Sequence, residues 1–267
     1  MSQRARTSDI SKYSKKGVIC KMKITFLGTS HGIPEVDRLC SCAMIEVGES
    51  IYLIDAGAPV VEEMIKREID LARIKGIFIT HPHCDHTLGL VHLCAICSWT
   101  QRYRSSDFEV FVPEIAILDG VRTVLKSAHC TLREEAIRFS EYQAGAVYDD
   151  GVMKLTAIPT KHCEPAPSYA FVVEAEGKRV IFSGDISFHM RGDDMPKCAM
   201  EEPGADAFIL ELAHNEIEHL RPYLERVTAK ALYFNHIYPA KMEGVKAEAD
   251  SFRYPIKFLS DGDEILI

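Results

Sequence analysis

A short stretch of the sequence combines an apolar segment with four side chains of the kinds that bind metal ions. The stretch is IFITHPHCDHTLG, and the four side chains, within six positions of one another, are His81, His83, Asp85 and His86. The apolar residues predict a β-strand that ends at Thr80, and the following TLGLVHLCAICSW predicts a helix. Imidazole nitrogens and carboxylate oxygens suit zinc, manganese and iron ions. Because one ion can hardly use four ligands from so short a loop, we expect two adjacent metal ions here.

Four further polar residues follow apolar segments farther along the chain. They are His162 after LTAIPTK, Asp185 after VIFSG, His214 after FILELA and His236 at the end of LYFNH. Each segment predicts a strand, and the carboxyl ends of neighbouring strands often line one rim where binding sites form. The sequence therefore predicts that these residues converge on the histidine cluster.

The order of the predicted elements indicates the fold class. Strands come first in hairpins, from KITFLG through AMIEV and SIYLIDAG, and then alternate with helices in two successive halves. This order favours an α+β sandwich of two mixed sheets with helices outside over a doubly wound parallel sheet. The last ten residues, FLSDGDEILI, predict a pair of closing strands. Of the 267 residues 47% are hydrophobic, as in a globular domain, and no apolar run reaches the length of a membrane helix.

The amino-terminal segment and the cysteines bear on domain limits and compartment. Residues 1–22 carry six basic side chains without an apolar segment, so we expect a disordered tail followed by one domain at residues 23–267. The nine cysteines are odd in number, and a chain of this size needs no disulfide scaffold. We therefore expect the cysteines to be mostly packing residues in a protein of the reducing cytoplasm.

The H-x-H-x-D-H motif, together with His162, SGD and the late His236, resembles the metallo-β-lactamase fold superfamily. The resemblance extends over residues 23–267 and includes LGTSHGIP and LIDAG. It implies a four-layer αβ/βα sandwich, a metal-bridging hydroxide as nucleophile, and Asp55 of LIDAG as a buried support of the site. It also implies two divalent ions, zinc first, with manganese or iron as alternatives. The implied ligands are His81, His83 and His162 for one ion and Asp85, His86 and His236 for the other, with Asp185 bridging both.

Three segments resemble the phosphodiesterase branch of this superfamily, which contains tRNase Z-like enzymes and cyclic phosphodiesterases of phosphonate pathways. They are LGTSHGIP, CEPAPSYAFVVE and the AHN…NHI pair. In that branch, a histidine 22 residues before the last ligand is expected to protonate the leaving alkoxide or bind a phosphoryl oxygen. Here it is His214, although Asn215 and Glu216 follow where the branch has Ser-Thr. Asp85 is assigned to catalysis as well as to metal binding. No role is assigned to His31, His189 and His219.

Spacing and charge lead to expectations about the substrate. Only 23 positions separate His162 from Asp185, which leaves no room for the long tRNA-gripping insertion of tRNA-processing members. The formal net charge of −8 provides no broad basic field for nucleic acid. Two ions would nevertheless leave the centre itself positive and attractive to an anionic ester. We therefore expect a small-molecule or nucleotide-like phosphodiester substrate, no extended nucleic-acid surface and no membrane partner, and the family resemblance implies a homodimer.

Two other functions stay open beside a metal-dependent phosphodiesterase. A hydrolase of thioester, lactone or β-lactam substrates would share the metal ligands and need an oxyanion donor in place of a phosphate-facing histidine. A protein that binds metal or nucleic acid without turnover is the second alternative. The phosphodiesterase is preferred because both ligand sets are complete and His214 is present.

Overall fold

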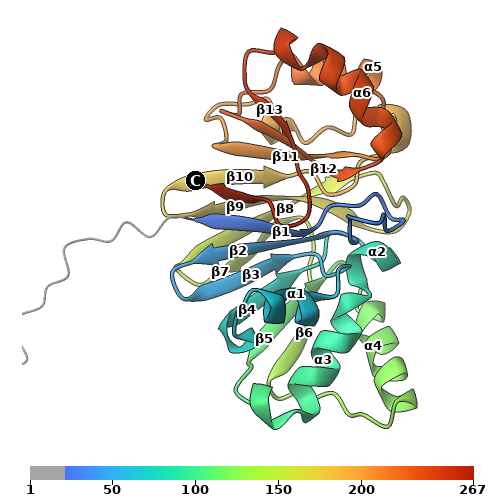
Figure 1. Ribbon diagram of the computed structural model, residues 1–267, viewed down its shortest axis with the longest axis vertical. Helices are drawn as coiled ribbons and strands as arrows, with labels where there is room; N and C mark the ends of the chain where they lie inside the picture. The colour runs from blue at the N-terminus through green and yellow to red at the C-terminus, as the bar shows by residue number, and fades with distance from the viewer. Residues whose placement is uncertain (1–21) are drawn as a thin grey trace, which may run out of the picture.

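The computed structural model describes residues 22–267, which form two seven-stranded sheets packed face to face (Figure 1). Helices cover the outer face of each sheet, so the layers run helix, sheet, sheet, helix. On the first sheet they are α1 (Val60–Lys66), α3 (Gly89–Trp99) and α4 (Ala116–Ser127), and on the second α5 (Ile217–Leu224) and α6 (Pro239–Glu248). This arrangement confirms the predicted α+β class and the four-layer αβ/βα sandwich.

The first sheet is built mainly from the amino-terminal half of the chain. Its strands are β1 (Lys23–Gly28), β2 (Cys42–Val47), β3 (Ser50–Ile54), β4 (Ile74–Phe78), β5 (Phe108–Val112), β6 (Ile137–Glu141) and β14 (Glu264–Leu266). They lie in the order β14-β1-β2-β3-β4-β5-β6. Pairing is antiparallel from β14 to β3, which includes the predicted β2–β3 hairpin, and parallel from β3 to β6.

The second sheet repeats this mixture of strand directions with the carboxyl-terminal half. Its strands are β7 (Gly145–Asp149), β8 (Met153–Thr160), β9 (Ser168–Ala175), β10 (Lys178–Phe182), β11 (Ala207–Leu212), β12 (Leu232–Ile237) and β13 (Ile256–Phe258). The order is β13-β12-β11-β10-β9-β8-β7. Pairing is antiparallel from β7 to β10 and parallel from β10 to β13.

Apolar side chains fill the layer between the sheets and the two layers beneath the helices. Neighbouring residues of one strand pack into different apolar layers, because successive side chains point to opposite faces of the sheet. Phe26 of β1 lies between the sheets, whereas Leu27 lies beneath the helices of the first sheet. Strands buried on both faces need nearly continuous apolar sequence, which explains the apolar runs. Cys42, Cys94 and Cys97 are fully buried packing residues, as expected.

The prediction that the last ten residues form a closing pair of strands was wrong. The structure places β13 beside β12 in the second sheet and β14 beside β1 in the first. Between them, Asp261 accepts hydrogen bonds from the Leu39 backbone N–H at 2.6 Å and the Thr29 hydroxyl at 2.8 Å. These contacts hold the chain where it crosses from one sheet to the other, and no local pattern in the sequence marks such a crossing.

The segment predicted as a disordered tail lies outside the described residues, apart from Met22. The Met22 side chain is fully buried, and its carbonyl accepts the backbone N–H of Ile267 at 3.0 Å. Among residues 22–267 there is no helix with the length and apolar character needed to cross a membrane.

An aromatic cluster joins the two sheets and allows a test of the sandwich. Phe78 of β4 stacks on Phe111 of β5, with 4.9 Å between ring centroids, and meets the edge of Tyr148 from β7 at 5.2 Å. Because Phe78 is fully buried, Phe78→Ala should lower the free energy of unfolding by about 3–5 kcal/mol. Denaturant unfolding measures this loss. Val152→Ala, in the exposed turn after β7, is the control and should change stability little; equal losses would contradict the role of the cluster.

Candidate metal centre

The predicted ligands come together where strands of both sheets end, beside the short helix α2 (Cys84–Thr87) at the right of Figure 1. His81 and His83 follow β4, Asp85 and His86 lie on α2, His162 follows β8, Asp185 follows β10, and His236 lies in β12. The amino-terminal half therefore contributes four of these side chains and the carboxyl-terminal half three.

A β-bulge turns His236 out of the regular pleat of β12. Glu211 of β11 is opposite Asn235, but the next residue, Leu212, is opposite Ile237. His236 is thus the extra residue, and its φ of 48° lies in the left-handed region. Bulges commonly re-aim a side chain next to a functional site, and this one re-aims an imidazole.

Three histidines and one carboxylate form the first group of ligand atoms. His83 Nδ1 lies 3.1 Å from His81 Nε2 and 3.3 Å from His162 Nε2. Each of these two Nε2 atoms lies 3.7 Å from Asp185 Oδ2. His81 is fully buried while His83 is exposed, so the group opens to solvent on the side of His83.

The second group of ligand atoms adjoins the first and shares its carboxylate. His86 Nε2 and His236 Nε2 each lie 3.2 Å from Asp85 Oδ2. Asp185 reaches this group as well, with Oδ2 at 3.6 Å from His86 Nε2 and Oδ1 at 3.7 Å from His236 Nδ1. Although burial disfavours its charged form, the imidazoles of His236, His86 and His81 hold the pKa of Asp185 well below its ordinary value. The central residue is therefore an ionised carboxylate between two sets of nitrogens.

Two of these ring nitrogens show that the cluster fits metal ions. His86 Nε2 and His236 Nδ1 are buried, and their contacts with Asp85 and Asp185 do not have the geometry of hydrogen bonds, so both atoms lack a hydrogen-bond partner. Buried polar atoms in folded proteins nearly always have a partner, and a cation among these donors would provide one. Asp85, His86 and His236 offer ligand atoms within 4.8 Å of one another, as do His81, His86 and Asp185. Nitrogen and oxygen donors so arranged suit divalent ions.

Asp55 supports the centre from behind. Its carboxylate accepts hydrogen bonds from the Thr80 backbone N–H at 2.8 Å and from the Thr80 hydroxyl at 3.0 Å. Asp55 Oδ2 also lies 2.7 Å from His86 Nδ1, while the Thr80 hydroxyl lies 3.0 Å from His81 Nδ1. Asp55 thus engages the outer nitrogen of His86 directly and that of His81 through Thr80. Such partners set the orientation of metal-binding rings.

His214 joins the cluster through a partner that the sequence analysis missed. Its ring centroid lies 4.6 Å from that of His162, and its Nδ1 lies 3.9 Å from Asp185 Oδ2. The missed partner is Glu211, whose Oε1 lies 3.0 Å from His214 Nδ1 and whose Oε2 accepts the His214 backbone N–H at 3.1 Å. Glu211 is the single charged residue of the fully buried strand β11, and a lone acid in an apolar strand was the available signal.

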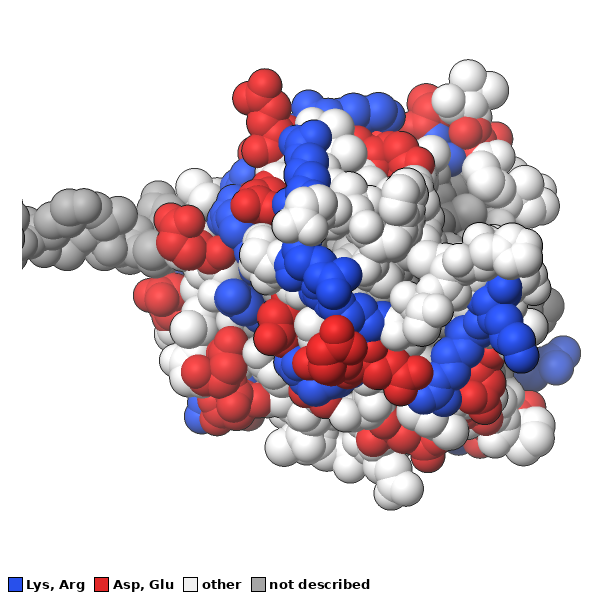
Figure 2. All heavy atoms as spheres, turned by 90° about the horizontal axis from the view of Figure 1, so that it is seen from below, with Lys and Arg blue, Asp and Glu red and all other residues white. Residues whose placement is uncertain are grey.

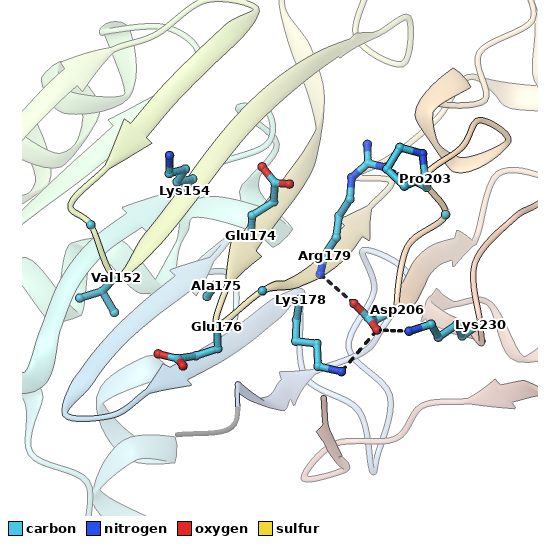
Figure 3. A pocket seen from close by; sticks show the side chains of 13 residues that line it. Val152, Lys154, Glu174, Ala175, Glu176, Lys178, Arg179, Pro203, Asp206 and Lys230 are labelled. Atoms are coloured by element: carbon cyan, nitrogen blue, oxygen red, sulfur yellow. Dashed lines mark hydrogen bonds and ion pairs between the residues drawn. The ribbon is translucent and has the colours of Figure 1, made fainter. Parts of the chain in front are cut away.

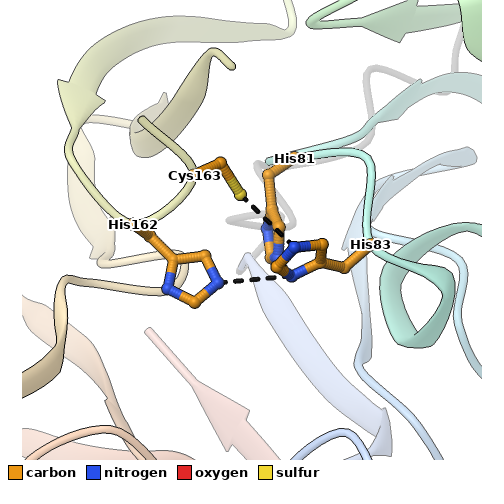
Figure 4. A group of neighbouring side chains, drawn as sticks. All are labelled: His81, His83, His162 and Cys163. Atoms are coloured by element: carbon orange, nitrogen blue, oxygen red, sulfur yellow. Dashed lines mark hydrogen bonds between the residues drawn. The ribbon is translucent and has the colours of Figure 1, made fainter. Parts of the chain in front are cut away.

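Cys163 also lies at the centre, although the cysteines were expected mostly to be packing residues (Figure 4). Its Sγ is 3.7 Å from His83 Nε2, whereas the other ring nitrogen, Nδ1, faces His81 and His162. Burial and the nearby Asp185 raise the pKa of Cys163 to about 12, so a neutral thiol contacts the outer nitrogen of His83. Its place directly after His162 was the only signal in the sequence.

A hollow of about 660 Å³ lies at the opposite ends of the strands, and its lining residues include no cluster of histidines (Figure 3). It is lined by the turns between β7 and β8 and between β9 and β10. Lys178 and Lys230 both pair with Asp206, at 3.6 Å and 2.7 Å. Because these charges satisfy one another, the histidine cluster is the better candidate for a functional site.

Solved structures share the architecture. The metallo-β-lactamase fold protein YhfI from Bacillus subtilis matches with a TM-score of 0.74 at 16% identity, covering 93% of this chain and 100% of that chain. A diphosphatase from the PhnP family matches with a TM-score of 0.69 at 19% identity, covering 91% and 97%. At these identities the likeness shows the fold. Fold and cluster together define a metallo-β-lactamase fold protein whose histidine–carboxylate centre suits divalent metals.

Sequence comparison then gives the family. A family model described as anti-Pycsar protein Apyc1 matches residues 22–250, and the chain belongs to this family. Among curated relatives, the ribonuclease Z of Crocosphaera subtropica is 30% identical over 150 residues, which are 55% of this chain and 47% of that protein. The chain spans about half the length of the curated relatives that it matches.

The expectation that the chain has no extended nucleic-acid surface was wrong. It rested on the net charge and on the short spacing between His162 and Asp185, whereas the matched curated relatives are named ribonucleases. Net charge averages over the whole surface, but nucleic acid responds to the local field. Figure 2 shows Lys and Arg interspersed with Asp and Glu on one face of this acidic chain. An acidic total therefore does not exclude an RNA substrate.

The contacts of Asp55 generate a prediction about metal affinity. Asp55→Asn removes the charge that faces His86 Nδ1 and disturbs Thr80, so the affinity for zinc should fall by roughly 10- to 100-fold. Competition with a fluorescent zinc chelator measures this affinity. The matched control is Asp70→Asn, because Asp70 is an exposed carboxylate that accepts the Ala72 backbone N–H. Equal affinities of the two variants would show that Asp55 does not support the metal ligands.

Proposed function

We propose that this chain is a dinuclear metal-dependent phosphodiesterase that acts on a small or nucleotide-like substrate. The observation that carries the proposal is the position of Asp185, whose Oδ2 lies within 3.7 Å of nitrogens from both ligand groups. A carboxylate so placed is suited to bridge two ions. The proposed ligands are His81, His83 and His162 for the first ion and Asp85, His86 and His236 for the second.

Divalent ions held there, with zinc as the proposed metal, would supply Lewis acidity and an activated water for attack on phosphorus. The chain's own residues orient the centre. Asp85 meets both His86 and His236 through one oxygen, and Asp55 holds the outer nitrogen of His86. We place Asp85 in the catalytic machinery because it connects these two histidines on the partly open side of the cluster.

His214 is the proposed proton donor to the leaving oxygen. Glu211 Oε1 lies 3.0 Å from His214 Nδ1, and a proton on Nδ1 satisfies this contact. Nε2 is then the nitrogen that exchanges a proton with the substrate. Glu211 is a positioning residue, since its second oxygen accepts the His214 backbone N–H and so holds ring and backbone together.

The names of the similar proteins favour phosphate esters over carboxylic substrates. The curated relatives are ribonucleases and one structural neighbour is a diphosphatase, and all of these names denote cleavage at phosphorus. A thioester, lactone or β-lactam hydrolase would need a donor aimed at a carbonyl oxygen. His214 with Glu211 instead forms a proton-transfer pair, which suits a poor alkoxide leaving group.

A substrate panel tests the proposed function. Metal content should be about two equivalents per chain, and bis(p-nitrophenyl) phosphate should be cleaved in a metal-dependent way. Asp185→Asn should lose metal and activity together, whereas Asp206→Asn, at the opposite ends of the strands, should retain both. An RNA oligonucleotide, an acyl thioester and a lactone are assayed beside the phosphodiester. Turnover of only the thioester or lactone contradicts cleavage at phosphorus, and turnover of RNA alone contradicts a small substrate. Full metal occupancy of Asp185→Asn would refute the bridging assignment.

The role of His214 predicts a dependence on the leaving group. His214→Ala should retain both metals but lower kcat by roughly 100-fold on a dialkyl phosphodiester, because an alkoxide needs a proton. The loss should be much smaller with p-nitrophenolate, which leaves without protonation. His219→Ala is the matched control, since His219 lies on α5 and accepts the Glu216 backbone N–H. An equal loss on both leaving groups would remove His214 from proton transfer.

A further inference from the structure

Phe188 is a half-exposed aromatic side chain at the edge of the metal centre. It lies three residues after Asp185 in the 3₁₀ turn η3 (Phe188–Met190), with 53% of its surface exposed. Its ring meets that of His214 edge-on, with 4.6 Å between centroids and an interplanar angle of 84°. It also lies 6.5 Å from the His162 ring at 28°. An apolar ring of this size is thus held in water beside a cluster of charged and polar groups.

The turn that carries Phe188 is anchored on buried polar groups. Asp194 accepts the backbone N–H of Ser187 at 2.8 Å and that of Lys161 at 2.8 Å, which ties the Phe188 turn to the loop of His162. Asn215 accepts the Met190 backbone N–H at 2.8 Å and donates to the Ser187 carbonyl at 3.1 Å. Asn215 is fully buried. Three hydrogen bonds to the backbone of Ser187 and Met190, on either side of Phe188, therefore hold the turn in place.

The same turn holds unfavourable backbone angles. His189 and Met190 have φ values of 54° and 51°, in the region that non-glycine residues avoid. Such backbone conformations are unfavourable for non-glycine residues and persist where the surroundings enforce them, commonly at functional sites. The anchors through Asp194 and Asn215 offset this cost. A turn built in this way holds Phe188 outward, although burial of the ring would stabilise the chain.

Two other exposed apolar side chains, those of Leu88 and Tyr238, lie close in the chain to proposed metal ligands. Leu88 follows His86 by two residues, and Tyr238 follows His236 by two with 43% of its surface exposed. The Tyr238 ring lies 4.7 Å from that of His31. An exposed aromatic ring in contact with a cluster of polar side chains offers apolar contact to a ligand that binds at the cluster. A substrate that combines an anionic group with a flat apolar part could meet both the centre and the Phe188 ring.

We propose that Phe188 is the platform on which the nucleobase of a nucleotide phosphodiester stacks while its phosphate lies at the metal centre. This inference rests on the proposed function and assigns Phe188 as the residue that recognises the base of a nucleotide-like substrate. Every base presents a flat face, and a half-exposed ring provides a matching one. Stacking of a base on an aromatic side chain strengthens binding by about tenfold or more. Phe188 would thus determine specificity without taking part in bond cleavage.

Two esters with one leaving group test the platform. Thymidine 5′-(p-nitrophenyl phosphate) carries a base, and methyl p-nitrophenyl phosphate does not. Phe188→Ala should lower kcat/KM about tenfold on the thymidine ester, chiefly through KM, and leave the methyl ester within twofold. Phe188→Tyr should restore the preference because it keeps a ring. The matched control is Trp99→Ala, an aromatic side chain 68% exposed at the end of α3, which should change neither rate.

A binding measurement separates this inference from the proposed function. Calorimetric titration of the metal-loaded protein uses thymidine 5′-monophosphate and inorganic phosphate as probes. Phe188→Ala should raise the Kd of the nucleotide about tenfold and leave that of phosphate unchanged. If the wild-type protein cleaves neither ester, the proposed function fails while the titration still decides the role of Phe188. The proposed role of Phe188 is wrong if Phe188→Ala changes the Kd of both probes equally or changes neither. It is also wrong if light scattering shows that the substitution alters the oligomeric state of the protein.

Discussion

The centre depends on one buried carboxylate surrounded by imidazoles. Asp185 lies between nitrogens of His81, His86, His162 and His236, at 3.6–3.7 Å. A charge taken out of water is costly unless other charges compensate it. The surrounding structure holds three of these four imidazoles in place, through Asp55 and Thr80 behind His81 and His86 and through the bulge at His236. Removing any of these supports leaves the central charge with fewer partners.

Much of the fold followed from periodicity. Short apolar runs separated by turns predicted the strands, and their order along the chain predicted two mixed sheets, because strands buried on both faces need continuous apolar sequence. The closing strands were assigned to one pair because the stretch looks like a hairpin. Asp261, which binds Thr29 and Leu39 where the chain crosses between the sheets, is a tertiary interaction that local pattern does not encode.

The metal ligands could be predicted because histidine and aspartate residues cluster directly after apolar strands, where binding sites form. The residues that position them were harder to find. Glu211 contacts His214 across one turn of chain, and Cys163 contacts His83 from the other sheet, 80 positions away. Net charge was misleading about nucleic-acid binding, because it sums the charges of all 267 residues. Binding depends on the local electrostatic potential of one part of the surface. Composition describes the whole surface, whereas recognition depends on part of it.

The distribution of the ligands over the chain has a consequence for folding. Asp85 and His236 meet across 151 positions, and each proposed ion draws ligands from both halves of the sandwich. Such an ion would act as a cross-link that closes a very long loop, and its binding energy would add to the docking of one half on the other. Neither half alone carries a complete ligand set. Metal binding would therefore depend on the docking of the two halves as well as on the geometry of the ligands.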